Sequence, residues 1–211
     1  MANEREKTTG AGVKTSDVRS NVKLALKKEV DHFRPLWPQL LVTAMGIAGT
    51  IGLSFVHHFT TLVISGIGYR SYPFFYLMIG QLGSNASNVA IGAFNPLLAA
   101  VFVFLLLGAI LPLFGKRGSK GVLVFSTVVY AIGILALLVA NSSYVLKWGI
   151  NPSLRSSVDV SNGYFGLGYG LLAAHVLINV FLPYVADAVS AEIGLRKFEK
   201  DVAVGHKMAS F

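Results

Sequence analysis

Two apolar runs separated by a short basic turn decide how this chain folds: residues 95–142 are NPLLAAVFVFLLLGAILPLFGKRGSKGVLVFSTVVYAIGILALLVANS. Residues 95–114 and 121–142 carry no charged side chain. Each run is long enough to cross about 30 Å of hydrocarbon as a helix. Only the six residues from Gly115 to Lys120 join them. A connection this short predicts that the two helices are antiparallel neighbours in a membrane.

The rest of the 211-residue chain has the same apolar character. Charged residues make up only 13% of it, whereas ordinary soluble domains have about 25%. Two further uncharged, apolar stretches predict membrane spans at 43–66 and 164–186. We therefore expect an all-α membrane protein, with a four-helix transmembrane bundle inside residues 37–190. The composition excludes disordered and collagen-like classes, and the absence of cysteine excludes a disulfide scaffold.

Polar and basic segments flank the predicted spans. Residues 1–16 predict a disordered tail, and residues 191–211 predict a cytoplasmic C-terminal tail. Residues 17–36 predict an amphipathic basic juxtamembrane helix, because apolar residues recur there at spacings of three and four. We expect the basic face of this helix to contact anionic lipids of the inner leaflet, through Arg19, Lys23, Lys27 and Lys28.

The distribution of lysine and arginine predicts the orientation of the chain. Fifteen of the 18 such residues lie before the first span, in the turn 115–120 or after the last span, and the other three are Arg70, Lys147 and Arg155. The positive-inside rule then places both termini and the basic turn in the cytoplasm. A further span in residues 71–94 would move that turn outside. We therefore expect an interfacial or re-entrant helix there, on the outer face.

Three histidines lie inside the predicted spans: His57, His58 and His175. The centres of the predicted spans put His57 and His175 at a similar depth. A pair of imidazoles there is what axial ligation of haem b requires, and it would also suit a quinone. The alternative is that each histidine bonds a backbone carbonyl or a hydroxyl group. The spans contain no Asp, Glu, Lys or Arg, which argues against ion-coupled transport.

Small residues recur at helix-packing spacing in the first and last spans. Such residues let helix backbones approach closely in a membrane. The pattern fits packing within the bundle, and it also fits association with another span. The candidates are Gly46, Gly49, Gly52, Gly166, Gly170 and Ala174.

Two Asn-x-Ser sequons lie on the predicted outer side. Asn85 is the candidate for glycosylation. Asn141 lies against the end of the third predicted span, too near the membrane for use.

The sequence lacks a P-loop, a nucleophile elbow, a zinc-protease motif and a nucleic-acid-binding fingerprint, so no catalytic or metal-binding residue is predicted. We expect a non-enzymatic tetraspan-type protein that organises a membrane domain, or a structural subunit of a larger membrane complex. Its expected partners are lipids, other subunits or a second copy. The alternative is a haem-b or quinone-binding anchor of an electron-transfer complex, with His175 and His57 or His58 as ligands. A small passive channel or lipid-handling protein is a third possibility.

Overall fold

The computed structural model describes residues 27–64, 68–80, 92–114, 120–153, 155–156 and 164–208. The chain divides into two compact units. The larger unit is Leu36–Ser190, and the smaller one combines Met1–Pro35 with Ala191–Phe211.

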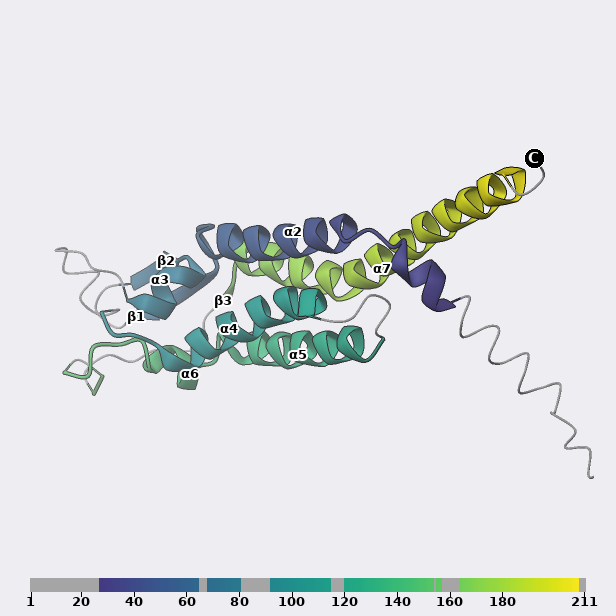
Figure 1. Cartoon of the computed structure of the whole chain (residues 1–211). Helices are drawn as coiled ribbons and strands as arrows, with labels where there is room; N and C mark the ends of the chain where they lie inside the picture. The colour runs from purple at the N-terminus through teal and green to yellow at the C-terminus, as the bar shows by residue number, and fades with distance from the viewer. Residues whose placement is uncertain are drawn as a thin grey trace, which may run out of the picture. The chain divides into compact units, whose positions relative to one another are not determined.

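Long helices lie side by side in the larger unit (Figure 1). They are α2 (Trp37–Ser54), α4 (Pro96–Ile110), α5 (Lys120–Val139) and the part of α7 (Leu167–Met208) up to Ser190. A short 3-10 helix, η2 (Leu111–Phe114), extends α4. Within the part of the chain that the structure describes, three segments are long and apolar enough to cross a membrane, which indicates a multi-pass membrane protein: Pro96–Phe114, Lys120–Val139 and Leu167–Val204.

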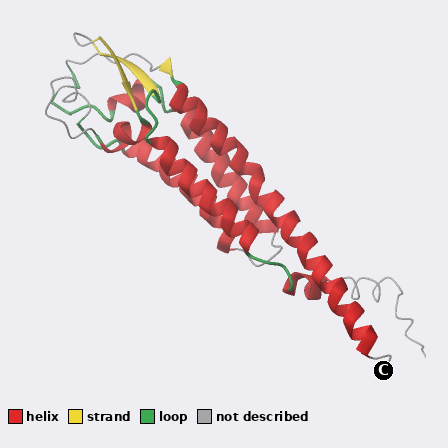
Figure 2. Ribbon diagram, turned by 90° about the horizontal axis from the view of Figure 1, so that it is seen from above, coloured by secondary structure: helices red, strands yellow, loops and turns green. Residues whose placement is uncertain are grey.

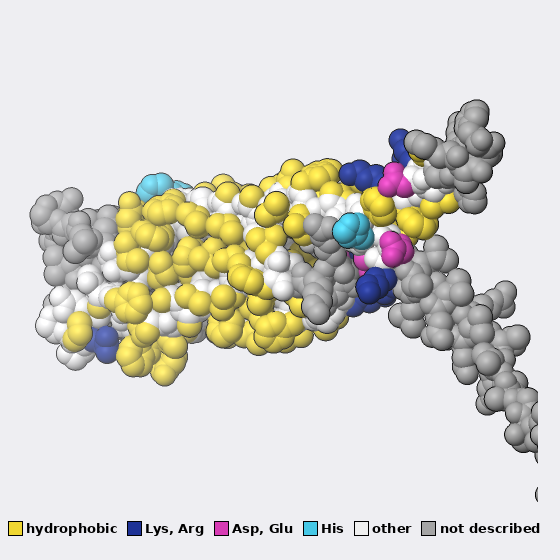
Figure 3. All heavy atoms as spheres, in the orientation of Figure 1, with side chains coloured by type: hydrophobic (Ala, Val, Ile, Leu, Met, Phe, Trp, Pro, Cys, Tyr) yellow, Lys and Arg dark blue, Asp and Glu magenta, His cyan; other side chains and the backbone are white. Residues whose placement is uncertain are grey.

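Apolar side chains cover the outside of the bundle (Figure 3). Leu135 of α5 is 64% exposed and Phe181 of α7 is 67% exposed. The polarity of α2 is reversed relative to a soluble helix: Thr43 and Thr50 are buried, whereas Met45 is 54% exposed. An apolar exterior of this extent is unfavourable in water. Hydrocarbon is therefore the solvent that suits this surface.

A small antiparallel sheet lies at one end of the bundle (Figure 2). Its strand order is β2-β1-β3, and its strands are β1 (Thr60–Ile64), β2 (Gly68–Tyr72) and β3 (Tyr164–Phe165). Thr60 pairs with Tyr72 on one side and with Phe165 on the other. The sheet thereby ties the segment after α2 to the segment that leads into α7.

The structure is mostly helical, as the all-α prediction expected, and the sheet adds short strands at one end. The sheet also corrects the predicted first span at 43–66. Helix α2 begins at Trp37, with Pro38 in its first turn, where proline is tolerated. It ends at Ser54, and His58 then adopts a positive φ of 61°. The residues that follow are largely β-branched and pair as a strand. Hydropathy alone does not separate such a strand from the continuation of a helix.

The other predicted spans differ from the structure mainly at their ends. Helix α5 ends at Val139 rather than at residue 142, and α7 begins at Leu167 because β3 occupies the preceding residues. Helix α7 then continues through most of the predicted tail at 191–211. At 42 residues it is about 63 Å long, twice the thickness of the hydrocarbon core.

The predicted interfacial segment at 71–94 contains α3 (Phe74–Ile79). Six residues of helix span about 9 Å, too little to cross a membrane. Helix α3 lies beside the sheet, and its Phe74 and Leu77 are buried. Residues 81–91, which include Asn85, lie outside the described residues.

The smaller unit joins the end of the basic N-terminal segment to the end of α7. Residues 27–32 are helical. The backbone carbonyl of Val30 lies 3.1 Å from the position that a Cβ would take on Gly194. The ring of Phe33 lies 6.3 Å from that of Phe198. The described end of the apolar stripe therefore packs on α7. The basic side chains Lys27 and Lys28 are exposed, and Arg19 and Lys23 lie outside the described residues.

The predicted hairpin of α4 and α5 packs closely, because Gly108 faces the ring of Tyr130. A Cβ on Gly108 would lie 2.7 Å from the ring carbon Cγ of Tyr130. The hydroxyl of Ser126 donates a hydrogen bond of 2.7 Å to the carbonyl of Gly108.

Replacing Gly108 by alanine should destabilise the hairpin. Overpacking of a filled interior costs about 1–3 kcal/mol, which exceeds the gain of about 1 kcal/mol in helix propensity. Thermal unfolding of the purified protein in detergent measures the effect as a lower midpoint. Gly121→Ala is the control, because nothing lies within 4 Å of its Cβ position. An unchanged midpoint for Gly108→Ala would contradict the close packing.

Candidate functional site

The helices of the bundle meet at Gly46, near the middle of α2. A Cβ on Gly46 would lie 3.1 Å from Cβ of Ala109 in α4, 3.4 Å from the hydroxyl oxygen of Tyr130 in α5 and 3.3 Å from Oδ1 of Asn179 in α7. Each of the other three helices thus contributes one side chain to this point. We call the surrounding groups the polar seam, defined as Thr43, Gly46, Thr50, Tyr130, His175 and Asn179.

His175 crosses from α7 to α2 within the polar seam. Its Nε2 lies 3.2 Å from the carbonyl oxygen of Gly46, and its Nδ1 lies 3.2 Å from Nδ2 of Asn179. A carbonyl only accepts hydrogen bonds, so Nε2 carries the proton. Nδ2 of Asn179 lies 3.0 Å from Nε2 and 3.2 Å from Nδ1, and Nδ1 is then the ring nitrogen that can accept a hydrogen bond from it. The same amide nitrogen donates to the backbone carbonyl of His175 at 2.8 Å. Each ring nitrogen of His175 therefore has a hydrogen-bond partner within the bundle.

Gly49 gives the imidazole its space. A Cβ at this position would overlap the ring, lying 2.6 Å from Nε2 and 2.8 Å from Nδ1 of His175. The ring therefore rests directly on the backbone of α2. Of the small residues predicted to mediate helix packing, the structure places Gly46 and Gly49 inside the bundle.

The other predicted packing residues lie elsewhere. Nothing described lies within 4 Å of the Cβ positions of Gly52 and Gly170, and both residues are exposed. Ala174 is exposed on the same helix, four residues after Gly170. Gly166 precedes α7, and a Cβ there would collide with the backbone carbonyl of His58. Gly166 therefore belongs to the sheet end of the unit and not to a helix-packing stripe.

The structure corrects the predicted common depth of His57 and His175. His57 and His58 are exposed and follow the end of α2. The carbonyl of His57 lies 3.0 Å from the Cβ position of Gly168, which is seven residues, or about 10 Å, from His175 along α7. The structure therefore does not bring together the two histidines that would be the axial ligands in the haem alternative. The error follows from the predicted span at 43–66, whose centre was placed about nine residues too late.

The hydrogen bonds of the polar seam hold α7 against α2. The partners of His175 are a carbonyl and an amide, and neither takes up or releases a proton near neutral pH. Among the described residues, no three His, Asp or Glu side chains are arranged to hold a metal ion. Polar contacts of this kind stabilise helix association in hydrocarbon.

The sequons have different positions. Asn141 is only 3% exposed, so its amide is not available to a glycosylating enzyme. The following Ser142 caps α6 (Ser143–Lys147), because its hydroxyl oxygen accepts a hydrogen bond of 3.4 Å from the backbone N–H of Val145.

The sequence analysis missed one group of residues at the sheet end. Lys147 and Arg155 were counted only as exceptions to the positive-inside rule. The structure places both in one pocket of about 240 Å³ with Tyr144 and Trp148. The guanidinium carbon of Arg155 lies 5.5 Å from the ring centroid of Trp148. The sequence signal that could have revealed this pocket is the presence of two cations and two aromatic residues within twelve positions of an outer loop.

Comparison with known proteins gives this chain no family: no family model, no curated protein and no solved structure matches it.

Replacing Gly49 by alanine should push His175 out of its place in the polar seam. The expected loss of unfolding free energy is about 1–3 kcal/mol, since the ring has no space to move into without losing its hydrogen bonds. Gly52→Ala is the matched control on the same helix. It gains the same helix propensity, about 1 kcal/mol, without a collision. Chemical or thermal unfolding in detergent measures both.

A double-mutant cycle separates the collision from other effects of the substitution. In a His175→Ala background the ring is gone, so Gly49→Ala should behave like Gly52→Ala. A Gly49→Ala penalty that persists without His175 would show that the imidazole does not rest on this glycine.

Proposed function

We propose that this protein is a four-span membrane protein that acts through lateral association, as a membrane-organising protein or as a structural subunit of a larger membrane complex. The observation that carries the proposal is a pair of small-residue tracks on the outside of the bundle. One track is Ala48 and Gly52 on α2, and the other is Gly170 and Ala174 on α7. All four residues are exposed.

These tracks are distinct from the small residues that the bundle uses for itself. Nothing described lies within 4 Å of the Cβ positions of Gly52 and Gly170. Each track pairs small residues four positions apart, so they lie on one helix face. A second span can approach such a face closely and gain van der Waals contact where hydrophobicity gives no preference for protein over lipid.

In this proposal α2 is the fourth span. Its 18 residues extend about 27 Å as a helix, close to the thickness of the hydrocarbon core. Its polar first turn, Trp37 to Gln39, lowers its mean hydropathy relative to α4 and α5. An exposed apolar face and a buried polar face support the same placement. Four crossings put both termini on one side, in agreement with the distribution of lysine and arginine.

The chemistry of the spans supports a role without catalysis or ion coupling. Among the described residues of α2, α4 and α5, the only charged side chain is that of Lys120, at the first residue of α5. In α7 the first is Asp187, about 30 Å from the start of the helix. No described charge thus lies at membrane depth, where transporters hold one.

Anionic lipid of the inner leaflet is a proposed partner of the N-terminal segment. The exposed side chains of Lys27 and Lys28 support this contact, because each basic residue near an anionic surface contributes about 1 kcal/mol of attraction.

The proposed orientation can be tested with single cysteines, because the natural chain contains none. In intact cells, a membrane-impermeant maleimide should label Ser153→Cys, in the loop after α6. It should label Ser119→Cys, in the basic turn, only after the membrane is permeabilised. Labelling of Ser119→Cys in intact cells would overturn the orientation.

The proposed association can be tested by filling the two tracks. Gly52→Leu together with Gly170→Leu should dissociate the assembly, because each added side chain holds a neighbouring helix away. The apparent mass on native gels in mild detergent measures the change. Ala131→Leu, at an exposed position of α5, is the matched control.

Membrane insertion should be equal for all of these variants. An assembly of unchanged size in the double variant would contradict the proposal. Gly166 is unsuitable for this test, since a side chain there would disturb the contact with His58 inside the monomer.

A further inference from the structure

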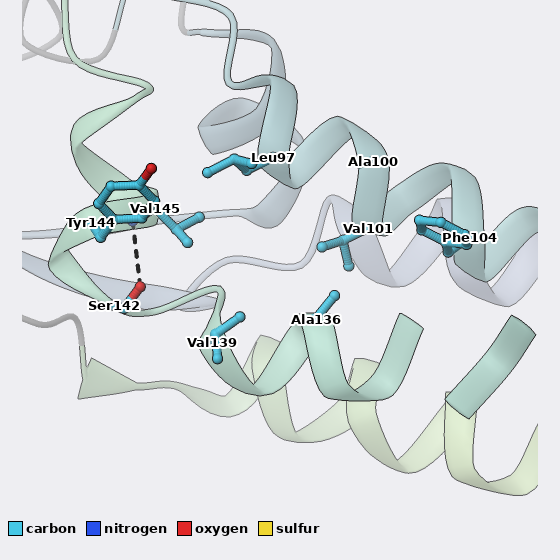
Figure 4. A pocket seen from close by; sticks show the side chains of 9 residues that line it. All are labelled: Leu97, Ala100, Val101, Phe104, Ala136, Val139, Ser142, Tyr144 and Val145. Carbon is cyan, nitrogen blue, oxygen red and sulfur yellow. Dashed lines mark hydrogen bonds between the residues drawn. The ribbon is translucent and has the colours of Figure 1, made fainter. Parts of the chain in front are cut away.

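An apolar groove opens between α4, α5 and α6, with a volume of about 500 Å³ (Figure 4). Its α4 wall runs from Leu97 to Phe104, which is about 10 Å along the helix. The α5 wall includes Ala136 and Val139. The hydroxyl of Ser142 is already engaged in capping α6. The groove therefore offers almost only hydrocarbon to whatever occupies it.

A basic, aromatic pocket adjoins the groove. Tyr144 lines both the groove and the pocket, so the two are neighbours at α6. The pocket contains Lys147 and Arg155, two of the three lysine and arginine residues that the sequence places in outer loops. Nε of Arg155 is buried and has no hydrogen-bond partner among the described residues, while the Nη2 nitrogen bonds the carbonyl of Ile150 at 3.4 Å.

Aromatic residues mark the pocket as lying at the level of lipid headgroups. Tyr144 is 69% exposed and Trp148 is 41% exposed. Exposed Tyr and Trp side chains collect at the membrane–water interface, where one end of the ring system is apolar and the other is hydrated. From this level the groove extends along α4 and α5, toward the interior of the hydrocarbon layer.

We propose that the groove and the pocket together bind an anionic phospholipid. One acyl chain lies in the groove between α4 and α5, and the phosphate lies between Lys147 and Arg155. Charge complementarity selects the headgroup, because Lys147 and Arg155 both line the pocket and none of the described residues that line it is a carboxylate. The apolar lining selects a chain and not a water-soluble phosphate.

Hydrogen bonds within the protein hold the site in shape, and these bonds form without lipid. Asn95 caps α4 by accepting hydrogen bonds from the backbone N–H groups of Leu97 and Leu98, at 3.1 and 3.2 Å. The amide of Asn95 also donates to the carbonyl of Val145 at 2.8 Å. This side chain, which is 1% exposed, fixes α6 against the start of α4. The groove walls and the cationic pocket therefore keep a constant distance.

Trp148 provides a local reporter for the test. The chain has two tryptophans, so Trp37→Phe leaves Trp148 as the single fluorophore. The full chain is reconstituted into phosphatidylcholine vesicles that contain phosphatidylglycerol with brominated acyl chains in both leaflets. Quenching of Trp148 then gives the relative binding constant of the anionic over the zwitterionic lipid. We expect a preference of about thirtyfold from two cations near the headgroup, at about 1 kcal/mol for each cation.

Two variants separate the headgroup from the acyl chain. Lys147→Gln combined with Arg155→Gln should reduce the preference for phosphatidylglycerol to about one, since the pocket loses both charges. Ala136→Phe should fill the groove and weaken quenching by the brominated phosphatidylglycerol. Lys120→Gln, at the other end of α5, is the control and should leave the preference unchanged.

A preference that survives the double Gln substitution would overturn the proposal. If water-soluble glycerol phosphate competed as strongly as phosphatidylglycerol, the proposal would also be overturned, because the site would then bind the anion without the acyl chain. A changed oligomeric state of Ala136→Phe with unchanged quenching would assign the groove to a protein partner instead. Native mass spectrometry of the unmodified chain gives an independent check, since retained phosphatidylglycerol is expected and its absence counts against the site.

Anionic lipid in both leaflets makes the outcome independent of the orientation proposed above. A failure of lipid binding therefore leaves the proposed association intact. The outer-leaflet assignment of the bound lipid rests on the proposed topology.

Discussion

The bundle depends on the absence of a side chain at two positions of α2. At Gly46, side chains of α4, α5 and α7 pack against the same short stretch of the α2 backbone. At Gly49, the imidazole of His175 lies where a Cβ would be. These contacts bring a helix carbonyl within reach of Nε2 of His175. In hydrocarbon, such close packing and interhelical hydrogen bonding replace the hydrophobic drive that assembles soluble bundles. The glycines and the histidine therefore form one structural unit.

The sequence predicted the features that depend on the solvent. The lengths and positions of α4 and α5 follow from uncharged apolar runs bounded by Asn95 and the basic turn. Their antiparallel pairing follows from the shortness of that turn. The hydrocarbon layer imposes these features on any chain that crosses it, so the composition of the sequence is enough to predict them. The part of α7 up to Asp187 has its midpoint near His175, and the sequence predicted this position for the same reason.

Features that depend on pairing between distant segments were not predicted. The residues after Ser54 are as apolar as a span, and only their pairing with Tyr72 and Phe165 makes them a strand. The shift of the first span moved the expected depth of His57 and suggested a histidine pair that the structure does not form. The pocket of Lys147 and Arg155 was missed for a related reason, since it requires α6 to lie against the start of α4 through the buried amide of Asn95.

The two proposed interactions use different helices and different physics. Lateral association uses exposed small residues of α2 and α7, and its energy comes from dispersion between closely approaching backbones. Lipid binding uses α4, α5 and α6, and its selectivity comes from two cations at the headgroup level. A protein partner on one pair of helices therefore need not displace the lipid on the other. Because Ala109 of α4, Tyr130 of α5 and Asn179 of α7 all lie against Gly46 of α2, the two surfaces belong to one packed bundle.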